Sequence, residues 1–169
     1  MTESYATILA GIITGAVGLV AAGIIWWQAK LLKRQIALST FLELDKEWNS
    51  EAMIETRKNV RREDGSWNIS RLEGALEFFE KLSMLESTKA LYKEDVFDST
   101  LIWYLARYFL FARDEIARLR SEKWKDNVYT DIEDLYDRFL DREAPSARGD
   151  WERNCKETEA DFWDGERQD

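Results

Sequence analysis

Histidine is absent from this 169-residue chain, which removes the side chain most often used as a general base and the commonest transition-metal ligand. We therefore predict no enzymatic activity, no cofactor and no metal site. The single cysteine, Cys155, excludes an internal disulfide and fits a reducing cytosol. Because only one proline and eight glycines interrupt a sequence rich in helix-forming residues, we predict an all-α fold: one amino-terminal transmembrane helix that continues into a cytosolic helical bundle.

Charged side chains are missing from Ser4 to Ala29. About 20 apolar residues are enough for a helix to cross the hydrocarbon core of a bilayer. We predict that residues 5–27 form this transmembrane helix, with Tyr5 at one interface and Trp26 and Trp27 at the other. A cleaved signal peptide is the competing interpretation, but its amino-terminal region is basic and its apolar stretch is shorter, about 7 to 15 residues.

The two flanks of this segment differ in charge. Lys30, Lys33 and Arg34 follow the predicted span, whereas residues 1–4 offer only Glu3 and the amino terminus. Basic residues concentrate on the cytoplasmic side of membrane helices. We therefore place residues 1–4 outside and the carboxyl-terminal domain in the cytosol, with the helix in a bacterial inner membrane and in contact with its lipids.

Small residues gather on one side of the predicted span when successive residues are placed about 100° apart. This face comprises Thr7, Ala10, Gly11, Thr14, Gly15, Gly18, Ala21 and Ala22. Small faces allow helix backbones to approach closely in membranes, so we predict a homo-oligomer. The face could be packed in a dimer or line the pore of a larger ring. The alternative is that glycine and alanine are simply common in membrane helices.

The rest of the chain is predicted as a cytosolic helical domain, residues 28–144, and an acidic tail, residues 145–169, with one short helix. The membrane helix is expected to continue to residue 48, and further helices are expected over 51–60, 70–86, 96–119 and from Ile132 to Leu140. Ser70 with Glu73 resembles a capping box. Turns are expected at 64–66, 125–127 and 145–149. Aromatic residues in the tail favour a helix that docks on the domain or on a neighbouring subunit.

Two charged clusters were weighed as binding sites. A carboxylate cluster, which could hold a divalent cation, is better explained as a solvated helix face because no calcium-binding loop accompanies it; it contains Asp131, Glu133, Asp134, Asp137 and Asp141. A basic cluster could meet lipid headgroups or a phosphate, but surface salt bridges explain it better; it contains Arg57, Lys58, Arg61 and Arg62. The net charge of −9 argues against general nucleic-acid binding.

Arg153-Asn154 resembles the start of the motif of HEPN ribonucleases, in which a histidine follows four to six residues after the arginine. Here those positions hold Glu157, Thr158 and Glu159. Without an imidazole to move the proton, we interpret the match as coincidence or as a site that has lost catalysis. Cys155 has no histidine partner, so we do not predict a nucleophile there.

Three stretches resemble a bacterial family of small membrane-anchored proteins that is known only as a domain of unknown function. They are LELDKEWNSEAMIETRKNV at 42–60, LEFFEKLSMLESTKALYKEDV at 76–96 and IARLRSEK at 116–123. The resemblance implies a membrane helix followed by a helical cytosolic domain. In its layout and size the chain is also similar to the membrane accessory of type VI-B CRISPR systems, which assembles as a ring-shaped pore and carries a degenerate HEPN motif.

These observations lead to two functional hypotheses from different classes. The first is a homo-oligomeric membrane effector whose helices surround a pore in CRISPR-linked antiviral defence. The alternative is a non-conducting membrane-tethered adaptor, whose tail residues Trp151 and Trp163 recruit a cytosolic protein partner. A membrane-anchored ribonuclease is disfavoured by the absence of histidine.

Overall fold

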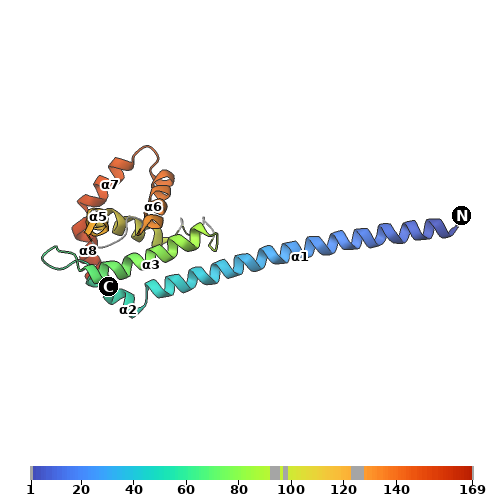
Figure 1. The fold of residues 1–169 in the computed structure, drawn as a ribbon, viewed down its shortest axis with the longest axis horizontal. Helices are drawn as coiled ribbons and strands as arrows, with labels where there is room; N and C mark the ends of the chain where they lie inside the picture. The colour runs from blue at the N-terminus through green and yellow to red at the C-terminus, as the bar shows by residue number, and fades with distance from the viewer. Residues whose placement is uncertain (1, 92–95, 97–98, 123–127, 169) are drawn as a thin grey trace. The chain divides into compact units, whose positions relative to one another are not determined.

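The computed structural model describes residues 2–91, 96, 99–122 and 128–168, but not the side chains of residues 2–10, 12, 13 and 168. Within these residues the protein is all-α, as predicted, with seven helices and no strand (Figure 1). The helices are α1 (Thr2–Trp48), α2 (Glu51–Lys58), α3 (Ile69–Ser87), α5 (Thr100–Glu122), α6 (Thr130–Glu143), α7 (Arg148–Glu157) and α8 (Glu159–Gln168).

The chain divides into two compact units, residues 1–39 and 40–169. The first unit consists of the amino-terminal part of α1, which is long and apolar enough to cross a membrane. The second unit contains the last turns of α1 and all the other helices. The predicted continuation of the first helix to residue 48 is therefore confirmed.

Helix α5 supplies much of the core of the second unit. Its buried side chains lie on several sides of the helix, as expected for the most apolar stretch outside α1; they include Leu101, Ile102, Leu105, Ala106, Tyr108, Phe109, Ala112 and Ile116. Helices α6 and α7 pack on α5, α3 packs on α6 and α2, and α8 packs on α2. The core therefore draws on every helix of this unit.

The sequence placed some helix ends correctly. Ser50 caps α2 by accepting a hydrogen bond from the backbone N–H of Met53 at 3.3 Å. The predicted turn at 64–66 is also present: Gly65 has φ +79°, and Asp64 accepts a hydrogen bond from the N–H of Ser66 at 2.8 Å. The hydroxyl of Ser66 also donates to Asp64, at 2.6 Å, and the two hydrogen bonds lower the pKa of this carboxyl, the hydroxyl having the larger effect.

Other predicted boundaries were wrong. Helix α3 begins at Ile69 rather than at the proposed capping box of Ser70, because the backbone N–H groups of Arg71 and Leu72 already donate to the carbonyl of Asn68. Helix α5 begins at Thr100, later than the predicted residue 96. The turn predicted at 125–127 lies outside the described residues.

The break predicted at 145–149 is shorter than expected, because Arg148 and Gly149 already belong to α7. The tail contains two helices, α7 and α8, instead of one. Trp163 of α8 is only 4% exposed, and residues 145–169 belong to the same compact unit as residues 40–144. The tail therefore docks on its own domain, which is one of the two outcomes expected from its aromatic residues.

Candidate functional site

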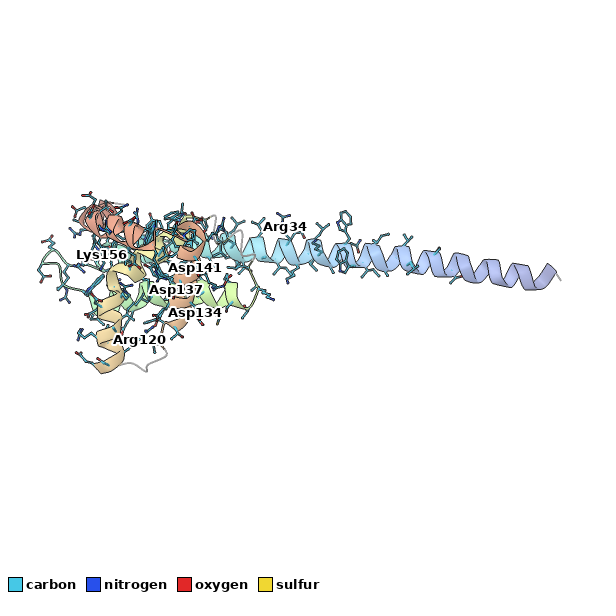
Figure 2. All side chains as sticks on the ribbon, turned by 90° about the horizontal axis from the view of Figure 1, so that it is seen from above. Arg34, Arg120, Asp134, Asp137, Asp141 and Lys156 are labelled. Atoms are coloured by element: carbon cyan, nitrogen blue, oxygen red, sulfur yellow. The ribbon has the colours of Figure 1, made fainter. Side chains whose placement is uncertain are left out.

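From Gly15 to Trp27 the first unit presents a continuous apolar surface. Large side chains from Val17 onward are exposed, from 78% for Leu19 and 68% for Trp26 to 43% for Leu31. Figure 2 shows side chains projecting outward from α1 on the amino-terminal side of Arg34. Soluble proteins rarely expose so large a continuous apolar patch, and such patches mark membrane or protein contacts.

The predicted small-residue face lies on this exposed part of α1. Gly11, Thr14, Gly15, Gly18 and Ala22 are all exposed. A Cβ atom added at Gly11, Gly15 or Gly18 would meet no other atom within 4 Å. No contact among the described residues therefore requires glycine at these positions. The backbone of Thr7 is helical, but its side chain, like that of Tyr5, lies outside the description.

The predicted interface residues Trp26, Trp27, Lys30, Lys33 and Arg34 lie on an exposed part of α1. Trp26 and Trp27 are exposed, and the ammonium group of Lys30 lies 5.7 Å from the centre of the Trp26 ring. Lys33 and Arg34 are also exposed. An aromatic pair followed by cations is the pattern that membrane helices show where they leave the lipid.

The carboxylate cluster behaves as a solvated face. Within the described residues no group of three or more cysteine or acidic side chains is placed to hold a metal ion. Asp137 instead pairs with Arg148 at 2.5 Å, and Glu133 pairs with Arg120 at 3.1 Å (Figure 2 labels Asp137 and Arg120). Asp137 and Glu133 therefore form salt bridges from α6 to α7 and to α5.

The basic cluster is split by the fold, and its surface interpretation was wrong for Arg57. This side chain is 5% exposed, and its guanidinium lies 4.6 Å from the centre of the Trp48 ring and 3.6 Å from Glu166. Glu166 also accepts a hydrogen bond from the hydroxyl of Tyr108 at 2.8 Å. We call Arg57, Glu166, Tyr108 and Trp48 the buried ion network.

The buried ion network joins residues from α1, α2, α5 and α8. Burial of the Tyr108 hydroxyl raises its pKa well above the ordinary value, and the carboxylate of Glu166 raises it further. Sequence reasoning missed the network, because Glu166 lies among many acids in the tail and nothing in its spacing marks it as buried. Through Glu166 these contacts hold α8 against α2 and α5.

Arg153 and Cys155, which the sequence analysis considered and rejected as catalytic residues, lie in different environments. Arg153 is exposed and pairs with Asp150 at 2.9 Å. Cys155 is 6% exposed, and burial raises the pKa of its thiol, although Arg107 opposes the shift. A raised pKa keeps a thiol protonated and unreactive at neutral pH.

A cavity of about 410 Å³ opens between α5 and α8 beside the buried ion network. Aromatic side chains of Trp103, Tyr104 and Phe162 line it together with Arg107 and Glu166. The guanidinium of Arg107 lies 5.6 Å from the centre of the Phe162 ring, so the chain's own cation already contacts this aromatic wall. Asp161 and Glu166 of α8 add carboxylates to the lining of the cavity, beside its aromatic wall.

The tail tryptophans proposed for partner recruitment are not free surface groups. Trp163 contacts the ring of Tyr108, with centroids 5.0 Å apart, and that of Trp67 at 5.6 Å. Trp151 is half-buried against Phe139, at 5.8 Å. An adaptor would therefore have to use another surface in this arrangement of the tail.

The geometry thus describes a helical domain that carries a long, exposed apolar helix. Comparisons with protein-family models, curated proteins and solved structures found no match to this chain. The resemblances noted in the sequence therefore stay expectations.

Proposed function

We propose that this protein is a homo-oligomeric membrane protein: α1 crosses the bilayer over residues 5–27, and the helical domain of residues 40–169 lies in the cytosol. The observation that carries the proposal is the exposed apolar surface of α1. Its aromatic pair and the cations that follow it support the orientation with the amino terminus outside.

The energy at stake supports lipid contact. The seven large apolar side chains between positions 17 and 27 are each at least half exposed: Val17, Leu19, Val20, Ile24, Ile25, Trp26 and Trp27. Burying one such side chain is worth about 1.5 to 3 kcal/mol, so leaving all of them in water would forfeit on the order of 10 kcal/mol. That is comparable to the whole stability of an ordinary domain, about 5 to 15 kcal/mol. A bilayer removes this cost.

Self-association is supported by the small-residue face. Lipid tails reward no particular apolar side chain, whereas a neighbouring helix packs more closely on a bare backbone. Because no other described part of the chain packs on Gly11, Gly15 or Gly18, a second molecule is the economical explanation for this face. A pore and a role in antiviral defence are further proposals, which rest on the architectural resemblance alone.

The test compares two double variants of matched chemistry. Gly11→Leu with Gly18→Leu places two large side chains on the small-residue face. Ala16→Leu with Gly23→Leu is the control, because it places two leucines at the same seven-residue spacing about 140° around the helix. Outside the helix backbone and the chain neighbours, no described atom lies within 4 Å of a Cβ built at Gly11, Gly18 or Gly23, so a clash with the described part of the chain is not expected.

Light scattering of the detergent-solubilised protein gives the outcome. We expect the first variant to fall to the 19.9 kDa mass of one chain, while the control keeps the mass of the oligomer. Equal masses for both variants would contradict assembly through this face. Release of a dye from liposomes by the wild type, and not by the first variant, would support conduction; its absence would favour the non-conducting adaptor.

A further inference from the structure

A second surface of α1 lies at the end of the proposed span and differs in chemistry from the small-residue face. When successive residues of this continuous helix are placed about 100° apart, five exposed side chains fall within an arc of about 120°. We call them the cationic face: Trp26, Trp27, Lys30, Lys33 and Arg34. Its centre lies about 120° around the helix from that of the small-residue face, so a molecule on one face leaves the other accessible.

The cations of this face have no anionic partner in the described part of the chain. Along the helix, the next acidic residue after Arg34 is Glu43, more than two turns away, and the last one before Lys30 is Glu3. The ion pairs of the described residues all involve other side chains, and most arginines of residues 40–169 take part in one. An anion from outside the chain is therefore the partner to expect.

The two tryptophans place these cations at the depth of lipid headgroups. Indole rings of membrane helices settle at the headgroup level, and Arg34 follows Trp27 by about two turns. The ammonium group of Lys30 stays close to this level, because it lies 5.7 Å from the centre of the Trp26 ring. The anions concentrated at this depth are the phosphates of phospholipids.

The charge of the face distinguishes between classes of phospholipid. The headgroup of phosphatidylcholine is neutral overall, whereas that of phosphatidylglycerol carries a net negative charge. Basic residues at the cytoplasmic end of a membrane helix attract anionic lipids, and the planar guanidinium of Arg34 can bind two phosphate oxygens at once. From Ser4 to Leu42 no acidic side chain opposes this attraction.

We infer that the cationic face binds the headgroups of anionic phospholipids, with its cations on the phosphate and its indole rings beside the glycerol backbone. This inference rests on the proposed function, and it names the class of lipid that lies against α1. The rest of the chain is net acidic, so an anionic membrane repels the domain and the attraction is confined to this face.

Quenching of tryptophan fluorescence by brominated lipids tests the inference on the full-length protein in liposomes. Two preparations contain equal parts of phosphatidylcholine and phosphatidylglycerol, and they differ only in which lipid carries bromine on its acyl chains. The proposed arrangement places Trp26 and Trp27 at the bilayer and the other tryptophans in the cytosolic domain. The quenching that remains in the variant Trp26→Phe with Trp27→Phe is subtracted.

The test variant neutralises the face as Lys30→Gln with Lys33→Gln and Arg34→Gln. In the wild type we expect phosphatidylglycerol to associate about fivefold more strongly than phosphatidylcholine, the factor that one basic residue near an anionic surface contributes. The test variant should lose this preference. A matched control, which should keep it, makes the same change of charge within residues 40–169, as Lys46→Gln, Lys58→Gln and Arg62→Gln.

The outcomes separate the inference from the proposed function. Equal quenching by the two lipids in the wild type would overturn the inference and leave the span in place, as would a preference that the test variant keeps or the control loses. If neither brominated lipid quenches Trp26 and Trp27, the helix does not lie in the bilayer, and both the inference and the proposed function are overturned.

Discussion

The buried ion network offers the sharpest test of the structure. In the variant Arg57→Met, the carboxylate of Glu166, which is 5% exposed, loses the cation 3.6 Å away. Removing one partner of a buried pair costs about 3 to 5 kcal/mol, mainly because the remaining charge is uncompensated. Glu166→Gln should be similarly costly, because it leaves the guanidinium of Arg57 buried without its anion.

The double variant separates this mechanism from loss of packing. A glutamine at 166 can still accept the hydrogen bond of Tyr108, and methionine at 57 still covers Trp48, so the double variant should be more stable than the summed single costs predict by about 2 kcal/mol or more. Urea unfolding of the detergent-solubilised protein, followed by tryptophan fluorescence, measures these free energies.

An exposed pair provides the control. Arg153→Met removes a cation that pairs with Asp150 while both side chains are about two-thirds exposed. Such pairs contribute less than about 1 kcal/mol. Two results would refute the buried charge pair. The first is that the losses of unfolding free energy from Arg57→Met and Glu166→Gln simply add in the double variant. The second is that Arg57→Met loses as little as Arg153→Met.

Two further predictions concern the domain. Trp163→Ala should lower the free energy of unfolding by about 3 to 5 kcal/mol in the same urea assay, because the ring is buried in the core, and a cost near zero would contradict a docked tail. Burial, with Glu77 nearby, raises the pKa of Tyr129 to about 12, whereas an unfolded tyrosine ionises near 10. Stability should therefore fall between about pH 10 and about pH 12, and Tyr129→Phe should reduce this fall; an unchanged profile would contradict the shift.

Much of the fold was predictable from local signals. The uncharged run before Lys30, the serine before α2 and the spacing of Ile132, Leu135, Tyr136 and Phe139 each depend on residues close in sequence. Helices form through such local contacts, so their presence could be read directly. Their ends were less certain, because a backbone carbonyl such as that of Asn68 can start a helix before the residue with a capping side chain.

The tail shows where local signals failed. Its high charge concealed the few positions that become buried, among them Cys155, Trp163 and Glu166. Nothing in the sequence distinguishes Glu166 from the acids around it. The basic cluster was misinterpreted for the same reason, because Arg57 is buried beside Glu166 and does not lie on the surface.

The sequence alone therefore determined the helical class, the apolar helix and the faces that this helix presents, because these follow from periodicity and composition along the chain. Only the tertiary structure decided which charges are buried and that α7 and α8 belong to the domain core. Those outcomes depend on contacts between residues distant in sequence, such as Arg57 with Glu166, where the environment rather than the residue type sets the energy.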